Sequence, residues 1–253
     1  MSVLLDRLTS VYPPLALLLS ALLMLSLGGC TDAKIDSSIS GKAPAGVIYC
    51  SESNPSYFNP QLDTSSTTAD VSAHQIYSRL LEFDPNTGRI QPGLASSWLV
   101  SDDGLTYTFQ LRRNVKFHNT NYFTPTRNFN ADDVIFSFQR WLDDAHPYHD
   151  VNNATYPYFS SLNLSKTIAS IDRINGYRIE IKLFKRDSSF LANLATDFAV
   201  ILSQQYGEYL LVNQQPENID FYPIGTGPYR FDEYRKNQFI RLLPHLEYWD
   251  LLA

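Results

Sequence analysis

The sequence predicts a mixed α/β fold with a sizeable core, in one large or two smaller domains. Residues 105–111 and 177–183 alternate apolar and polar side chains with a period of two, which is typical of half-buried strands. Residues 129–144 carry the signals of a helix start. Strands and helices do not alternate strictly, so the pattern favours a mixed architecture over a doubly wound sheet. With 253 residues, of which 44% are apolar, the chain is long enough to bury a substantial core.

The N-terminus has the pattern of an export signal. Residues 15–27 form an apolar run that is too short to span a bilayer and suits the central region of a signal peptide. The run ends in LGGC, which resembles a bacterial lipobox, so we expect residues 1–30 to be a signal peptide. Cys30 is the candidate lipidation site, and the sequence leaves open whether it is acylated. If Cys30 is acylated or removed, Cys50 has no disulfide partner in the chain, which leaves a buried free thiol or a partner elsewhere.

The first elements after the signal follow from composition. Residues 31–45 are small and polar and predict a tether, and residues 46–50 begin a strand. The next segment predicts a helix, capped by Thr67, Thr68 or Asp70, from apolar residues near helical spacing: Val71, Ile76, Tyr77, Leu80 and Leu81. Residues 84–88, with the sequence DPNTG, predict a turn.

The middle of the chain contains the clearest helix start. Asn130 is the expected N-cap, and Asp132 and Asp133 lie where the positive end of the helix favours acids. Val134, Phe138 and Trp141 form part of its apolar face. The following segment, residues 143–166, is rich in Asn, Pro, Tyr and Ser and predicts a long surface loop.

Two further segments complete the expected elements. Residues 187–195 predict a helix that opens on Asp187 or Ser188. Residues 225–228, with the sequence GTGP, predict a turn before a strand, because glycine tolerates a positive φ and proline fixes the next φ. A Walker phosphate loop needs a different glycine spacing and a following lysine, and a dinucleotide fingerprint needs a third glycine, so this turn does not predict a nucleotide site.

The net charge and the polar residues predict no nucleic-acid, metal or catalytic site. The net charge of −6 gives no electrostatic footprint for nucleic acid. His146 and His149 have a spacing that can serve a metal, but Pro147 lies between them and no third ligand is near, so we expect a surface loop and no metal. The aspartate pairs at 102–103, 132–133 and 143–144 fall at turns or helix ends, where acids serve as caps and solvated ends. We therefore expect no catalytic residue and no cofactor.

Five landmarks occur in order along the chain. They are LASSWLVSDDGLTYTFQLRRNVKFHN (94–119), FNADDVIFSFQR (129–140), IASIDRINGYRIEIKL (168–183), PIGTGPYRFDEY (223–234) and EYWD (247–250). Together they resemble the family 5 extracytoplasmic solute-binding proteins, the dipeptide- and oligopeptide-binding subunits of ABC importers. Within that family, residues 121–140 and 149–164 are most similar to the Sap-type peptide-binding proteins.

The resemblance implies a fold and a division of the chain. It implies the mixed-sheet lobe of a type II (class C) periplasmic binding protein with an inserted subdomain. Residues 46–75 and 169–253 would form lobe I, and residues 76–168 the inserted subdomain. The second lobe would be missing, so that the chain would be an N-terminal fragment and would bind peptides weakly by itself.

The resemblance also implies a function and a site. The chain would be the non-catalytic substrate-binding component of a peptide ABC transporter in the periplasm or cell envelope. Its partners would be peptides, including antimicrobial peptides, and the membrane permease subunits, with the membrane reached only through a lipid anchor. Thr64, Ser65, Ser66 and Thr67 match the segment whose main chain meets the ligand backbone; alternatively, they cap the following helix. A secreted hydrolase and a passive envelope lipoprotein are the alternative functions.

Overall fold

The computed structural model describes residues 50–250. The predicted signal peptide (1–30), Cys30, the tether (31–45) and most of the strand expected at 46–50 lie outside the described residues. Cys50 belongs to no strand, and it is an exposed free cysteine. Of the two alternatives for Cys50, the buried thiol is therefore wrong, and a partner elsewhere stays a prediction.

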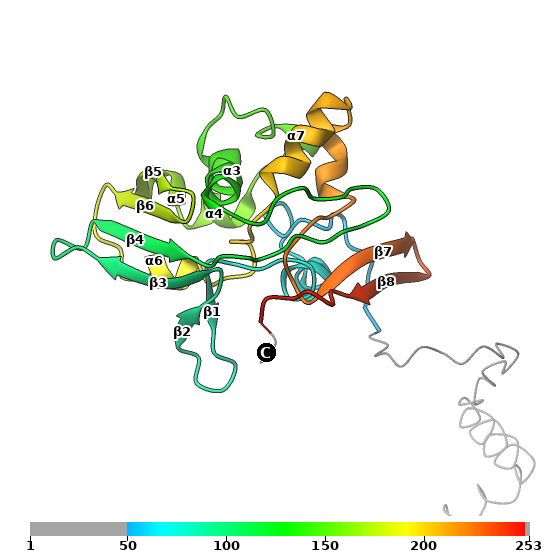
Figure 1. The fold of residues 1–253 in the computed structure, drawn as a ribbon, viewed down its shortest axis with the longest axis horizontal. Coiled ribbons are helices and arrows are strands. Elements are labelled where there is room, and N and C mark those ends of the chain that lie inside the picture. The colour runs from blue at the N-terminus through cyan, green and yellow to red at the C-terminus, as the bar shows by residue number, and fades with distance from the viewer. Residues whose placement is uncertain (1–49, 251–253) are drawn as a thin grey trace, which may run out of the picture. The chain divides into compact units, whose positions relative to one another are not determined.

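A four-stranded antiparallel sheet forms the largest β element of the described residues, in the order β3-β4-β6-β5 (Figure 1). Its strands are β3 (Ala95–Val100), β4 (Thr106–Leu111), β5 (Ile168–Asn175) and β6 (Arg178–Leu183). The two segments predicted by alternation are the central pair, and Phe109 of β4 lies opposite Ile179 of β6. Both side chains are fully buried, which confirms the predicted period of two.

Helix α3 (Ala131–Leu142) packs against β5. Asn130 is its N-cap, as predicted: the side chain accepts a hydrogen bond from the Asp132 N–H at 2.7 Å, and the Asp133 side chain accepts one from the Asn130 N–H at 2.9 Å. Val134, Phe138 and Trp141 are buried on its inner face. The predicted helix start is confirmed.

The turn at residues 84–88 is also confirmed. It connects β1 (Leu81–Phe83) to β2 (Ile90–Pro92), a hairpin that projects away from the four-stranded sheet in Figure 1. Asp84 Oδ1 accepts hydrogen bonds from the N–H groups of Asn86 and Thr87 at 2.8 and 2.9 Å. Gly88 completes the turn with a φ of 65°.

The helix expected from Val71 to Leu81 was placed wrongly. The structure has a short helix α2 (Ser66–Thr68) that continues into one π-helical turn η2 (Ala69–Ala73). The apolar residues beyond Ala73 are buried without being helical, because distant segments use their carbonyl groups: the Ile76 oxygen accepts from the Gly227 N–H at 2.9 Å. Tertiary hydrogen bonds thus override the local helical pattern.

Residues 143–166 are not a surface loop as predicted. They contain three short helices, η3 (Val151–Asn153), α4 (Pro157–Ser161) and α5 (Leu164–Thr167). Tyr148, Tyr156 and Phe159 are buried. The aromatic residues of this segment therefore belong to the core around α3.

The C-terminal part of the described chain begins with short helices. They are α6 (Phe190–Asn193), α7 (Gln204–Val212) and the 3₁₀ helix η4 (Pro216–Asp220). The N-cap of α6 is Ser189, so the helix begins later than the predicted opening on Asp187 or Ser188. No helix within residues 50–250 combines the length and the apolar character that a membrane crossing requires.

Strands β7 (Tyr229–Arg235) and β8 (Phe239–Pro244) form a separate antiparallel hairpin. Figure 1 shows this hairpin on the opposite side of the described unit from the four-stranded sheet. The GTGP turn leads into β7, which confirms the predicted turn and strand. The predicted division into lobe I and an inserted subdomain stays a prediction; the four-stranded sheet takes strands from both sides of residue 168.

Candidate functional site

The segment Thr64–Thr67 lies at the start of α2. Ser65 caps this helix, because its Oγ accepts a hydrogen bond from the Thr68 N–H at 3.3 Å. The backbone of Ser65 is extended, with φ −70° and ψ 140°. The capping role considered from the sequence is therefore present, and it leaves the ligand-binding role of the segment as a prediction.

The preceding residue, Asp63, holds this segment in place. Its carboxylate accepts hydrogen bonds from the Ser65 N–H at 2.9 Å, the Ser65 hydroxyl at 2.9 Å and the Thr68 hydroxyl at 2.7 Å. Burial raises the pKa of Asp63, but the hydrogen bonds from Thr68 and Ser65 outweigh it, so that the pKa lies below its usual value. The sequence analysis missed Asp63, although Asp-x-Ser before a helix is a readable local signal; Asp187 and Ser189 repeat it before α6.

The four residues of the segment differ in their exposure. Thr67 is buried, and its hydroxyl is within hydrogen-bond distance of the Ser51 and Ser53 hydroxyls, at 3.1 and 2.9 Å. Thr64 and Ser66 are exposed. Within residues 50–250, the main-chain N–H and C=O of Thr64 have no hydrogen-bond partner, whereas the Ser65 N–H is taken by Asp63. Thr64 is thus the residue of the segment that can best offer its main chain to a ligand.

A buried ionic network anchors the chain just before this segment. Arg140 and Asp220 are both 0% exposed and make two parallel hydrogen bonds of 2.8 Å. The Asn59 amide donates to Asp220 Oδ1 at 2.7 Å, and the Asn152 amide donates to Oδ2 at 2.7 Å. The Phe58 N–H also donates to the Asp220 carbonyl at 2.8 Å. The network therefore fixes the Asn-Pro segment that leads to Thr64.

The glycines of the GTGP turn serve close packing. Positive φ in the described glycines occurs at Gly88 and Gly104, so the two glycines of this turn do not use the positive φ that glycine tolerates. A Cβ at Gly225 would lie 2.0 Å from the Ile76 carbonyl oxygen, and one at Gly227 would lie 2.5 Å from the Gln75 oxygen. The turn lies directly on the main chain of residues 75–76, which leaves no room for a side chain.

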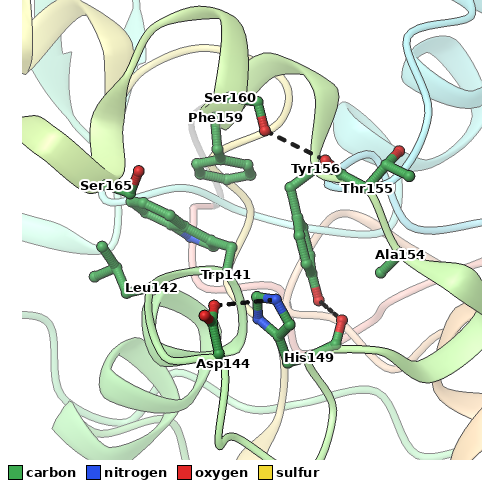
Figure 2. A pocket seen from close by; sticks show the side chains of 10 residues that line it. All are labelled: Trp141, Leu142, Asp144, His149, Ala154, Thr155, Tyr156, Phe159, Ser160 and Ser165. Carbon is green, nitrogen blue, oxygen red and sulfur yellow. Dashed lines mark hydrogen bonds and ion pairs between the residues drawn. The ribbon is translucent and has the colours of Figure 1, made fainter.

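A hollow of about 240 Å³ lies beside α3 and α4 (Figure 2). Trp141 and Phe159 form its wall as a stacked pair with ring centroids 4.2 Å apart. At its rim, His149 Nε2 lies 3.4 Å from Asp144 Oδ1, and the Tyr156 hydroxyl donates to the His149 carbonyl at 2.8 Å. These rings and polar groups contact one another, so nothing in the hollow selects a particular ligand.

The residues weighed for catalysis or metal binding have structural contacts. His149 Nδ1 is 2.9 Å from the Arg140 carbonyl oxygen, and the His146 ring packs against Phe136. Asp133 serves as a cap, as predicted, but it is buried rather than solvated. Arg127 binds its two oxygens at 2.7 and 2.8 Å. In the part of the chain that the structure describes, no cluster of three His, Cys, Asp or Glu residues could hold a metal.

Comparison with known proteins places the chain in a family. The family model of "Bacterial extracellular solute-binding proteins, family 5 Middle" matches residues 89–252. Heme-binding protein A of Haemophilus influenzae is 46% identical over 80% of this chain and 37% of its own length. The probable ABC transporter periplasmic-binding protein SapA of Escherichia coli is 44% identical over 81% of this chain and 38% of its own length.

A solved structure agrees with these relatives. The dipeptide-binding protein of Pseudoalteromonas sp. SM9913, crystallised in complex with Met-Leu, is 49% identical, with a TM-score of 0.78 over 79% of this chain and 40% of that chain. The chain thus spans about two fifths of the length of these relatives, and it has the mixed α/β fold of part of a periplasmic peptide-binding protein. The similar identities with the heme-binding protein and SapA support the family as a whole. The chain belongs to family 5 of the bacterial extracellular solute-binding proteins.

Proposed function

We propose that the chain is part of the substrate-binding component of a peptide ABC transporter, and that the main chain at Thr64 contacts the ligand. The observation that carries the proposal is the likeness, at 49% identity, to a protein crystallised with the dipeptide Met-Leu. SapA, named as an ABC transporter periplasmic-binding protein, supports the transporter assignment. The role is binding without catalysis.

The proposed contact uses backbone hydrogen bonds. Thr64 is exposed and its N–H and C=O are unpaired within residues 50–250, so an extended peptide can pair with both groups. Backbone pairing is independent of the ligand's side chains, which suits a binder of varied peptides. Asp63 keeps Ser65 and Thr68 in place while it occupies the Ser65 N–H. A ligand therefore meets a preorganised segment, which lowers the entropic cost of binding.

Calorimetric titration tests the proposal. The protein is the longest natural polypeptide that contains this chain, and the ligands are Met-Leu, a small panel of di- and tripeptides, and hemin. We expect several peptides of different sequence to bind with similar affinity and without hydrolysis. Release of free amino acids would favour a secreted hydrolase, binding of hemin alone would favour a heme carrier, and no binding at all would favour a passive envelope lipoprotein.

A pair of variants tests the contact region. Asp63→Ala removes the acceptor for Ser65 and Thr68, whereas Asp187→Ala removes the equivalent Asp-x-Ser contact before α6. Each variant loses hydrogen bonds to a carboxylate, worth about 1.5–3 kcal/mol apiece. We expect only Asp63→Ala to weaken peptide binding, by about tenfold, because α6 has no proposed ligand contact. Equal affinity in the two variants would refute the placement at Thr64.

The finer parts of the proposal concern location and anchoring. We infer that the signal within residues 1–30 exports the chain to the periplasm, that it is cleaved before Cys30 and that Cys30 carries a lipid. We also infer that the partners include the permease subunits of the transporter. Antimicrobial peptides are among the proposed ligands because the resemblance of residues 121–140 and 149–164 to the Sap-type proteins implies them. Mass spectrometry of the mature N-terminus tests the anchor: a diacylated cysteine at position 30 is expected, and an unmodified cleaved terminus would refute it.

A further inference from the structure

Two histidines fasten the GTGP turn to the rest of the described unit. The His118 N–H donates to the Gly225 carbonyl at 2.9 Å, and the Gly225 N–H donates to His118 Nδ1 at 3.3 Å. His118 Nε2 lies 2.9 Å from the Gly227 carbonyl oxygen, which can only accept. These contacts assign one neutral tautomer to His118, in which Nδ1 accepts and Nε2–H donates.

His245, which directly follows β8, contacts the same Gly227 carbonyl. Its Nδ1 lies 3.1 Å from the Gly227 oxygen, and its N–H donates to the Pro228 carbonyl at 2.8 Å. The rings of His118 and His245 are perpendicular, with centroids 4.8 Å apart, and both residues are buried. The two histidines thus close the base of the β7–β8 hairpin, before β7 and after β8.

Protonation is incompatible with this arrangement. A proton on His118 Nδ1 would point at the Gly225 N–H, so that a donor would face a donor. Two histidinium rings at 4.8 Å would also repel each other. The other charged groups that face the pair are Arg230 and Lys116, which add positive charge, and Glu247, which is paired with Lys116.

The electrostatic environment agrees with two neutral rings. Burial, with smaller contributions from His245 and Arg230, lowers the pKa of His118 from 6.5 to about 3, although the hydrogen bond to Gly227 opposes the shift. Burial also lowers the pKa of His245, and Gly227 and Glu247 oppose it. Protons therefore bind more tightly when the segment is open, so opening becomes more favourable as the pH falls below 6.5.

The hairpin also has contacts away from the histidines. The Asn237 N–H donates to Asn54 Oδ1 at 2.8 Å, and the Tyr234 ring packs against Phe58 with centroids 5.4 Å apart. Beside the histidines, the Gly227 and Tyr229 N–H groups donate to the main chain at Ile76 and Gln75, each at 2.9 Å. Phe231 packs edge-on against Phe58 at 4.9 Å. An isolated two-stranded hairpin is at best marginally stable in water. The hairpin pairs with no strand of the four-stranded sheet, so loss of the histidine contacts would weaken the attachment of this segment before it affects that sheet.

We propose that His118 and His245 form an acid-sensitive clasp that holds residues 225–245 on the rest of the described unit at neutral pH and releases them when the rings are protonated. None of the contacts of the clasp involves the segment at Thr64, so the inference does not rest on the proposed peptide contact.

Hydrogen exchange at single amides tests the clasp. The amides of Gly227 and Tyr229 report on the segment, and those of Leu111 and Leu183, which donate to Tyr177 and Leu105, report on the sheet. After correction for intrinsic exchange, His118 alone should raise the opening equilibrium of the segment about 25-fold from pH 7 to pH 5, from the pKa values of 6.5 and about 3. The sheet amides should change far less. Equal changes at both places would overturn the proposal.

The double variant His118→Gln and His245→Gln supplies the control. Glutamine can donate to the Gly227 carbonyl but does not titrate between pH 5 and 7, so the acid-dependent opening should disappear. Persistence of the same acid step in the double variant would contradict the clasp. A second measurement needs no variant: the native His118 ring resonances should not titrate between pH 5 and 7. A titration near pH 6.5 in the folded protein would equally overturn the proposal.

Discussion

The buried pair of Arg140 and Asp220 should behave as a coupled unit in stability measurements. Each oxygen of Asp220 accepts from one guanidinium nitrogen and one asparagine amide, at distances of 2.7–2.8 Å. Asp220→Asn therefore places an NH₂ group against two donors whichever way the new amide is turned. It also leaves the guanidinium of Arg140, 0% exposed, without its carboxylate. Removal of one partner of such a buried pair costs about 3–5 kcal/mol.

A double-mutant cycle measures the coupling. Arg140→Met alone leaves a buried carboxylate, so we expect a loss of about 3–5 kcal/mol in the free energy of unfolding for each single variant. When Arg140→Met is added to Asp220→Asn, each of the two terminal side-chain atoms of residue 220 faces one asparagine donor instead of two donors. The double variant should therefore lose less than the sum of the singles, by about 2 kcal/mol. The assay is urea unfolding followed by tryptophan fluorescence and circular dichroism, with coincident transitions as the two-state test.

The pair of the exposed Arg173 and the half-buried Asp132, 3.3 Å apart, is the control nearer to solvent. The same cycle there, with Arg173→Met and Asp132→Asn, should show a coupling below about 1 kcal/mol. Additive losses at Arg140 and Asp220 would refute the reasoning, because they would show that neither group depends on the other.

Three further outcomes follow from the structure. Gly225→Ala should destabilise the protein by about 2 kcal/mol or more in urea unfolding, because its Cβ would lie 2.0 Å from the Ile76 carbonyl oxygen. Gly88→Ala, where the Cβ meets nothing within 4 Å, should cost only about 1 kcal/mol from its positive φ, and an equal loss in both would contradict the steric argument. Asn130→Ala should cost about 1 kcal/mol through loss of the capping box, and no loss would contradict that role. Cys50 should react fully with a maleimide in the native state, and protection until unfolding would show that it is covered.

Local patterns in the sequence predicted the elements that depend on local contacts. Phe109 and Ile179 lie on the buried face of strands whose neighbouring side chains are polar, so alternation was sufficient. Asn130 caps α3 through residues two and three positions away, which a short motif can reveal. The turn at Asp84 is local in the same way. The landmarks added the family, which local patterns alone could not supply.

Elements that depend on distant partners were predicted poorly. Ile76 fits a helical pattern, but its carbonyl accepts a hydrogen bond from Gly227, and no local signal reveals that contact. The composition of the segment around Tyr156 is that of a polar loop. In the structure, Tyr156 is buried, and its hydroxyl accepts a hydrogen bond from Arg140 Nε at 3.1 Å. Asn59 and Asp220, in hydrogen-bond contact, are 161 residues apart in the chain. Such pairs become visible only in three dimensions.

The family resemblance proposed a position for the candidate site, and the structure adds the local contacts there. Thr64, Ser65, Ser66 and Thr67 came from the family resemblance, and their ligand contact stays a prediction. The structure adds that Thr67 is buried, that the Ser65 N–H is used by Asp63, and that Thr64 has unpaired main-chain groups within residues 50–250. The Asp-x-Ser motif in the sequence indicates that Asp63 can bind Ser65. Only the structure shows that the Thr68 hydroxyl donates to the same carboxylate.

A crystal structure of the longest natural polypeptide that contains this chain, with Met-Leu bound, tests the central claim most directly. The proposal predicts hydrogen bonds of 2.7–3.2 Å between the main chain of Thr64 and the backbone of the dipeptide, the usual range for N–H···O contacts. It also predicts that Asp63 keeps its contacts with Ser65 and Thr68. A dipeptide bound elsewhere, with the main chain of Thr64 in solvent, would contradict the proposed site.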